Sequence, residues 1–339
     1  MADVIDKYKA NPGYFTILFK ILESQGVLSE STDKNHDIHI TEFGKKILSN
    51  CHLFEGFKDY YKESIALIND NSHSTKNFEK TFHHIYDSYS SIQLEKPENH
   101  IIKTCIQGGL IAPVIILESF AKKRSNPSKM PNSVLGFLQN FNYLDLQNNK
   151  TAKGKYFLSK CHAYGVPSSY MRTFCHLEDL LFGDYQSIWK KDSSSNEYHV
   201  NRSMNVWGSG KSHKSYFKDM DIFVESIFNK PLDQQPHGIS DMGCGDGSFL
   251  LHLYNLIKEN TIRGDNLETH PLHLVGADYN QAALDATLET FKNTDIRPPI
   301  TVLADIANPD NFNKNLKSIS KLNLSDLLNV RSFLDPNYR

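Results

Sequence analysis

The chain has 339 residues, of which 39% are hydrophobic and 22% are charged, and its formal net charge is −2. This composition indicates a soluble globular protein of about two domains, without a global charge that favours nucleic acid or an acidic membrane. The first residues lack the basic region and apolar core of a signal peptide, and no apolar run approaches the roughly 18 residues of a membrane span. Five scattered cysteines fit a reducing compartment, so we expect a cytoplasmic protein.

The first half of the chain contains a weak internal repeat. Residues 41–52 align with residues 151–162, and Thr, Gly, Lys, Leu, Ser, Cys and His recur at equivalent positions. Each segment follows a helix-like apolar run and a short extended stretch. This order of helix, polar hairpin and Thr-x-x-Gly resembles winged-helix units. We therefore predict a mostly helical lid or docking domain over residues 1–189, with two such units.

Three features of this half allow other interpretations. Winged helices often bind DNA, but the one dense basic run, residues 122–129, is broken by proline and is typical of a solvated loop. The duplicated Cys-His pairs suggest zinc, but adjacent side chains on a helix point roughly 100° apart, which favours half-buried cysteines instead. Residues 101–117 are apolar and predict a bent core helix or, alternatively, a wall of a hydrophobic substrate tunnel.

A polar, serine-rich stretch at residues 190–197 predicts the junction with a second domain at 198–339. Residues 199–217 then combine glycines, a tryptophan and several polar side chains, which predicts a loop that faces a ligand. His199 and His213 lie in this segment. Each is either a packed or solvated histidine or a general base, metal ligand or substrate contact, and we take His213 as a catalytic candidate.

The most informative stretch is residues 239–247. An apolar run ends at Asp241 and is followed by Gly243, Gly245 and Gly247, and then by helical apolar spacing. Such a strand, glycine turn and helix N-terminus lets a ligand approach the backbone closely. Cys244 lies inside the turn as a small residue whose backbone matters. The pattern D-x-G-x-G-x-G resembles motif I of S-adenosylmethionine (SAM) methyltransferases.

Three further apolar runs end in acidic residues. Residues 273–278 predict a strand that ends at Asp278, the candidate for the ribose hydroxyls, and Asn280 caps the helix that follows. Residues 300–306 end at Asp305, the candidate for the adenine amino group, and residues 327–335 form a fourth run. Tyr279 and Ile306 complete the predicted cofactor-binding residues. Strands that alternate with helices predict a parallel, Rossmann-like α/β sheet of the class I methyltransferase type.

Five motifs together are similar to the methyltransferase domains of polyketide synthases, in particular the loading-module C-methyltransferases of the apratoxin type. The motifs are Asn-Val-Trp-Gly-Ser-Gly at 205–210, the lead at 222–231, the glycine turn, Gly-Ala-Asp-Tyr-Asn at 276–280 and Val-Arg-Ser-Phe-Leu-Asp at 330–335. The resemblance covers roughly residues 130–335. It implies C-methylation by SAM of a malonyl or acyl unit on an acyl carrier protein, and a single iron or manganese ion whose ligands are unknown.

The resemblance and strand-end position make Arg331 and Asp335 catalytic candidates beside His213, although Arg331 and Asp335 can also form a structural salt bridge. Relatives often read Phe-Leu-Asp-His-Asn-Arg where this chain has Pro336 in place of the histidine. Two other functions stay open: a small-molecule O-methyltransferase, and a degenerate SAM-binding module. Because a complete sheet of this class has more strands than the four predicted here, we also expect a polyketide synthase partner or a missing C-terminal half.

Overall fold

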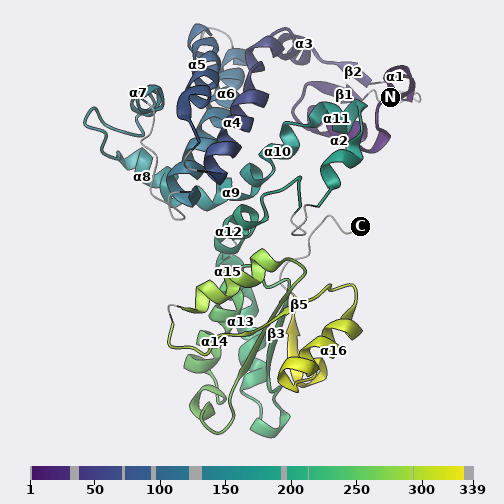
Figure 1. Ribbon diagram of the computed structural model, residues 1–339, viewed down its shortest axis with the longest axis vertical. Coiled ribbons are helices and arrows are strands. Elements are labelled where there is room, and N and C mark those ends of the chain that lie inside the picture. The colour runs from purple at the N-terminus through teal and green to yellow at the C-terminus, as the bar shows by residue number, and fades with distance from the viewer. Residues whose placement is uncertain are drawn as a thin grey trace. The chain divides into compact units, whose positions relative to one another are not determined.

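The computed structural model describes residues 2–30, 38–70, 73–92, 97–121, 132–191, 197–212, 214–292 and 294–331. The chain divides into two compact units, Met1–Asn201 and Arg202–Arg339, which are called the helical unit and the sheet unit below (Figure 1). Each unit has its own hydrophobic core. The mixed α/β class that the sequence predicts is confirmed.

The helical unit consists of short helices, one long helix and one small hairpin. Its elements are α1 (Ala2–Tyr8), α2 (Pro12–Ser24), β1 (Leu28–Glu30), β2 (Ile38–Ile40), α3 (Glu42–Leu48), η1 (Cys51–Phe54), α4 (Phe57–Asn69), α5 (Thr75–Ser91), α6 (Pro97–Ile116), η2 (Leu117–Ala121), α7 (Asn132–Asn140), α8 (Ala152–Ser159), α9 (Cys161–Ser169), α10 (Met171–Phe174), α11 (Leu177–Phe182) and η3 (Tyr185–Trp189).

Aromatic rings form the centre of the helical unit. Tyr60, Phe78, Phe82 and Phe137 are at most 1% exposed. The ring centroids of Tyr60 and Phe78 lie 5.3 Å apart, and those of Phe82 and Phe137 lie 5.4 Å apart. Such pairs stabilise a core by about 0.5–1.5 kcal/mol beyond their burial. The Tyr60 hydroxyl donates to Leu110 O at 2.8 Å, which connects α4 to α6 without leaving a buried donor unpaired.

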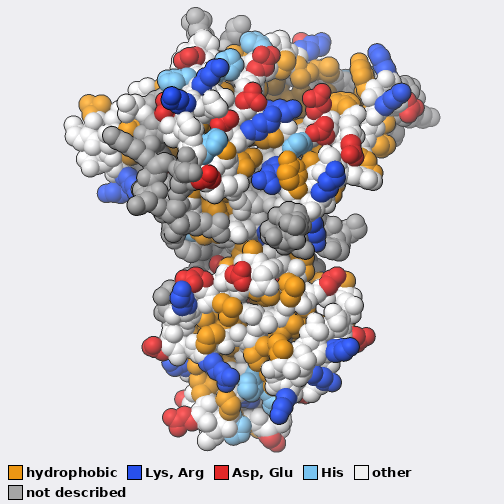
Figure 2. Space-filling view, viewed as in Figure 1, with side chains coloured by type: hydrophobic (Ala, Val, Ile, Leu, Met, Phe, Trp, Pro, Cys, Tyr) orange, Lys and Arg blue, Asp and Glu red, His pale blue; other side chains and the backbone are white. Residues whose placement is uncertain are grey.

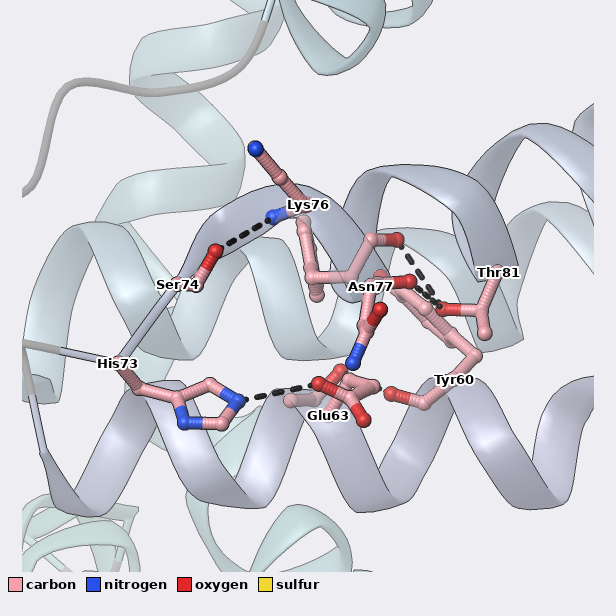
Figure 3. Close-up of polar contacts among 9 residues, drawn as sticks. Tyr60, Glu63, His73, Ser74, Lys76, Asn77 and Thr81 are labelled. Carbon is pink, nitrogen blue, oxygen red and sulfur yellow. Dashed lines mark hydrogen bonds and ion pairs between the residues drawn. The ribbon is translucent and has the colours of Figure 1, made fainter.

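The turn between α4 and α5 is held by polar contacts (Figure 3). His73 Nε2 lies 3.1 Å from Glu63 Oε2, and Ser74 Oγ accepts from Lys76 N at 3.4 Å at the start of α5. Because these groups are partly exposed, the His73–Glu63 contact contributes only about 0–1 kcal/mol. The aromatic core, and not this contact, therefore holds the two helices together.

The segment Asn99–Ala121 corrects one expectation from the sequence. By length and composition it is apolar enough to cross a membrane, although we expected no such segment. It forms α6 and η2 and packs against α4, α5 and α9, with Pro113 inside the helix. Its buried side chains include Ile102, Ile106, Leu110, Val114, Ile116 and Phe120. This burial is typical of the bent core helix that the sequence also predicts.

The internal repeat has the same local structure in both copies. In the first, α2 leads into the antiparallel β1–β2 hairpin and then α3. In the second, α7 leads into an antiparallel bridge between Leu144 and Lys150 and then α8. Both copies are therefore helix–hairpin–helix units. Their assignment as winged helices stays a prediction.

The repeated threonine and glycine explain why this pattern recurs. Thr41 Oγ1 accepts from Gly44 N at 2.8 Å, and Thr151 Oγ1 accepts from Gly154 N at 3.1 Å, so each threonine caps a helix. Each hydroxyl also donates to a backbone carbonyl of the preceding turn at 2.6 Å. A Cβ at either glycine would collide with a carbonyl oxygen of the preceding hairpin. The helix approaches the hairpin so closely that only glycine fits.

The sheet unit alternates strands and helices. Its elements are α12 (Arg202–Ser212), α13 (Lys214–Phe228), η4 (Leu232–Gln234), β3 (Gly238–Met242), α14 (Ser248–Asn260), η5 (Gly264–Asn266), β4 (His273–Asp278), α15 (Gln281–Lys292), β5 (Ile300–Leu303), α16 (Pro309–Ser320), η6 (Leu324–Asp326) and β6 (Leu327–Val330). Asn280 Oδ1 accepts from Ala282 N at 2.9 Å and caps α15, as the sequence predicts.

The four described strands form one parallel sheet in the order β5-β4-β3-β6. Helices α13, α14 and α15 contribute to the core on one face, and α16 packs its Phe312 and Leu316 on the other, as Figure 1 shows. Counted along the chain, this is the strand order 3-2-1-4 of doubly wound folds. The order reverses between β3 and β6, and ligands bind at the carboxyl ends of the strands beside such a point.

One predicted loop is a helix. We expected residues 199–217 to form a ligand-facing loop, but residues 202–212 form α12, and α13 follows. Glycine and serine disfavour a helix, yet α12 packs against α15, α13 and α14. Tertiary packing therefore overrides the weak local preference. The small size of Gly210 lets α12 approach the glycine turn, because a Cβ there would collide with the Asp246 carboxylate.

Candidate cofactor-binding site

The loop between β3 and α14 uses three glycines with left-handed backbone. Gly243, Gly245 and Gly247 have φ angles of 91°, 57° and 73°, which other residues adopt only at a cost. The amides of Gly243 and Cys244 both donate to Ala277 O of β4, at 2.8 and 3.0 Å. The loop conformation thus requires this glycine spacing, and the loop is fixed against the end of the neighbouring strand.

The glycines differ in what surrounds them. A Cβ at Gly247 would lie 2.8 Å from the Thr287 side chain, whereas a Cβ at Gly245 would meet nothing within 4 Å. Gly247 is therefore needed for packing against α15, and Gly245 faces open space. The Cys244 thiol lies 3.4 Å from Thr287 Oγ1 and is buried, and this burial raises the pKa of Cys244 far above its usual range. A neutral thiol is a packing group and not a nucleophile.

Asp241, at the end of β3, is a buried carboxylate without a partner. Its residue is 1% exposed, and within the described part of the chain neither carboxylate oxygen has a hydrogen-bond partner. Burial and then the nearby Asp278 carboxylate raise the pKa of Asp241 to about 7. Buried polar groups are normally satisfied, because an unpaired one costs free energy. Its position beside the glycine turn indicates that a bound ligand supplies the missing partner.

Asp278 ends the neighbouring strand and is held in place by backbone amides. Its Oδ1 accepts from Asn280 N at 3.0 Å and its Oδ2 accepts from Gly245 N at 3.3 Å. Burial raises the pKa of Asp278, although these amides and the Arg202 guanidinium oppose the shift. The carboxylate therefore has a fixed orientation at the carboxyl edge of the sheet, directly across the glycine turn.

A third carboxylate occupies the start of α14. Asp246 Oδ1 accepts from Ser248 N at 3.1 Å, so a carboxylate of the chain itself takes the first amide of the helix. Loops that bind phosphate leave these amides to the ligand. Together with Asp241 and Asp278, Asp246 makes this end of the sheet acidic. A positively charged ligand fits such a site better than a phosphate does.

The remaining predicted cofactor contacts lie along the same edge. Arg202 Cζ lies 5.7 Å from the centroid of the Tyr279 ring, which is 38% exposed. Asp305 follows β5, is exposed, and accepts from Ala307 N at 2.8 Å through Oδ1. Ile306 is also exposed, at 36%. The structure thus brings the strand-end residues of β3, β4 and β5 to one edge of a single sheet.

The structure describes only one of the three catalytic candidates, Arg331. His213 and Asp335 lie outside the described residues, as does Pro336. Arg331 directly follows β6 and is exposed at the same edge of the sheet. Their catalytic roles therefore stay predictions.

The expected iron or manganese ion has no set of ligands in the described ranges. No group of three or more His, Cys, Asp or Glu side chains that could hold a metal occurs there. His199, which we considered as a ligand, is buried in the helical unit, with its ring 4.5 Å from that of Trp189. The described side chains thus do not fit the metal, and we derive no catalytic step through it.

Sequence reasoning missed three residues of this site. Arg202 was not singled out because its segment was taken for a loop, whereas a helix over 202–212 places it at the first turn. Thr287 lies on the predicted helix 281–291, but only the fold shows that it faces the glycine turn. Asp246 stands inside the glycine motif, and an aspartate two residues before Ser248 has the spacing of an Asx-turn.

The parallel sheet, in the order β5-β4-β3-β6 with helices on both faces, is compatible with the fold of a methyltransferase domain. Residues 197–339 match the family model described as the AprA MT2-like domain. This confirms the apratoxin-type methyltransferase resemblance for that part of the chain, and the family implies the use of SAM. No curated protein shows a significant match.

Proposed function

We propose that this protein transfers a methyl group from SAM to a carbon of a malonyl or acyl unit carried by an acyl carrier protein, in polyketide biosynthesis. The observation that carries the SAM site is the buried, unpartnered Asp241 beside the glycine turn. SAM has a positively charged sulfonium and ammonium, so it complements the acidic site formed by Asp241, Asp246 and Asp278. A dinucleotide would place two phosphates against these carboxylates, which like-charge repulsion opposes.

We assign residues at the strand ends to each part of SAM. Asp278, fixed by two amides, accepts from the ribose hydroxyls. The exposed apolar side chains of Tyr279, Leu303 and Ile306 offer a surface for the adenine ring, and Asp305 accepts from its amino group. The methionine portion lies against Gly245, where no side chain occupies the space beside the backbone.

Methyl transfer needs positioning more than activation, because the sulfonium already activates its methyl group and a neutral thioether leaves. The central carbon of a malonyl thioester is acidic between two carbonyl groups, and His213 is the proposed base that takes its proton. The carbanion then attacks the methyl carbon in line, the sulfur–methyl bond breaks, and S-adenosylhomocysteine leaves. The sheet unit holds the donor at the switch point between β3 and β6. Arg331 lies at the end of β6, where its guanidinium suits the thioester or carboxylate oxygens of the acyl unit. His213 and Asp335 are proposed to act on the same substrate.

The proposed functional domains are the helical lid or docking domain, 1–189, and the methyltransferase domain, 198–339. The repeated helix–hairpin–helix units, read as winged helices, support the docking role. On the visible face, basic and acidic side chains are intermixed within each unit, with no single-sign patch for nucleic acid (Figure 2). The described cysteines are all free, in accord with a reducing, cytoplasmic location. The partner is then an acyl carrier protein, from a polyketide synthase, or a free acyl substrate.

Calorimetry and a transfer assay with the full chain test this proposal. The protein should bind SAM, and intact-protein mass spectrometry should show the gain of one methyl group on a malonyl carrier protein. Reactions run with and without Fe(II) or Mn(II) show whether a metal contributes. Methylation of free phenols or carboxylates alone would favour the O-methyltransferase alternative. SAM binding without any transfer would favour a degenerate binding module, and a folded protein that binds no SAM would refute the proposal.

A further inference from the structure

Arg202 lies at the cofactor edge, and neither the glycine motif nor the strand-end acids give it a role. It opens α12, which packs against α15 and lies close enough to the glycine turn that Gly210 approaches the Asp246 carboxylate. Its guanidinium carbon lies 5.7 Å from the centroid of the Tyr279 ring. Arg202 is therefore a cation on an element outside the strands, placed over the residue that follows the strand-end acid of β4.

The charges around Arg202 explain what a cation does there. Asp241 is buried and Asp278 is half-buried, and the negative charge of Asp278 disfavours ionisation of Asp241, so a proton competes with a ligand for these carboxylates. The positive charge of Arg202 acts on Asp278 in the opposite direction and favours its ionised form. A carboxylate that stays ionised is a better acceptor for two hydroxyl hydrogens.

The geometry adds a second effect. A guanidinium over an aromatic face restricts the ring, and Tyr279 is attached directly to Asp278 along the chain. We infer that Arg202 is a cofactor-positioning residue, which holds Asp278 and Tyr279 in the arrangement that receives the ribose and adenine of SAM. This inference rests on the proposed function, because it assigns a role within the same cofactor site.

Two ligands separate this role from the obvious alternative, in which Arg202 binds the SAM carboxylate. S-adenosylhomocysteine contains both the adenosine and the amino acid portion, whereas 5′-methylthioadenosine contains adenosine without the carboxylate. If Arg202 positions the groups that contact ribose and adenine, Arg202→Ala should weaken both ligands by a similar factor, about tenfold. Arg202→Lys keeps the charge but loses the planar guanidinium, so it should restore part of the affinity for both.

The experiment is calorimetric titration of the full chain with each ligand, for the unchanged protein and for Arg202→Ala, Arg202→Lys and Arg297→Ala. Arg297 is an exposed arginine of the same unit and serves as the matched control. Thermal unfolding of the ligand-free variants shows whether the fold is intact. Equal losses with both ligands, partial rescue by lysine and no loss for Arg297→Ala support the inference.

Different results overturn different statements. If the unchanged protein binds neither ligand, the proposed function itself fails and this inference fails with it. If the unchanged protein binds both but Arg202→Ala binds them equally well, only the role of Arg202 is refuted. A loss confined to S-adenosylhomocysteine would also refute it, because Arg202 would then contact the carboxylate and not position the adenosine site.

Discussion

Replacing Asp241 with asparagine removes a buried charge while it keeps the shape of the side chain. The pKa of Asp241 is raised from 3.8 to about 7 by burial and by Asp278. Between these values the folded protein binds a proton that the unfolded chain has released, so stability falls as pH rises and levels off above pH 7. From pH 5 to pH 7 the folded protein loses about 1.36 kcal/mol of stability for each pH unit, or about 2.7 kcal/mol in total. Asp241→Asn lacks this loss, so without ligand it should be the more stable protein at pH 8.

Urea denaturation at pH 5 and pH 8 measures this effect. The chain has two tryptophans, Trp189 in the helical unit and Trp207 in the sheet unit. A Trp189→Phe background therefore makes fluorescence report on the sheet unit alone. The stability advantage of Asp241→Asn should widen by about 2.7 kcal/mol between the two pH values, while its affinity for SAM at pH 8 falls.

Asp305→Asn is the matched control, because Asp305 is also a strand-end acid but is exposed. Because this side chain is exposed, its replacement should change the unfolding stability by less than about 0.5 kcal/mol. A pH-independent difference for Asp241→Asn would refute the assignment of a buried, ligand-free carboxylate. Greater stability combined with weaker SAM binding is the result expected of a group kept for function at the expense of the fold.

Three further predictions follow from the same site and from the repeat. Asp278→Ala should weaken SAM binding by about 1.5–3 kcal/mol, roughly 10- to 150-fold by calorimetry, with a folded circular dichroism spectrum. Gly247→Ala should lower the free energy of unfolding by about 2–4 kcal/mol, because it combines a left-handed backbone with a collision against α15. Gly245→Ala, which meets no neighbour, should lower it by about 1–2 kcal/mol and act mainly on SAM affinity. Equal stability losses for the two variants would contradict this distinction. Gly154→Ala should destabilise the helical unit by at least about 2 kcal/mol in thermal unfolding, because its Cβ meets a backbone carbonyl, while Gly136→Ala, with open space around it, should be neutral or stabilising.

The strands of the sheet unit were predictable because buried parallel strands leave a simple pattern. Residues 273–278 and the helix from 281 were predicted with their starts and the strand end as observed, and the third strand ends at Leu303, three residues before the predicted Ile306. Of the described strands, β4 ends at a polar residue, and Asp278 shows how such an end also marks the ligand edge of the sheet. The spacing of apolar residues and the turn residues were therefore sufficient to predict most strands and helices of this unit.

Two features were not predictable because they depend on packing between distant segments. The sequence of α12 contains glycine and serine in amounts typical of a loop, and only its packing on α15 and the glycine turn makes it a helix. Within the site, the lack of a partner for Asp241 is a property of the folded surroundings, which no spacing of residues along the chain reveals.

The central position of β3 has a consequence for when the cofactor site can form. β3 pairs with β4, which follows it closely, but its other neighbour is β6, whose first residue, Leu327, pairs with Gly238. Closing so long a stretch of chain costs entropy and slows the pairing. During synthesis, β3, β4 and the glycine turn leave the ribosome well before β6 does. We therefore expect a nascent chain to acquire its SAM site late, only after residue 330 has emerged and joined the sheet.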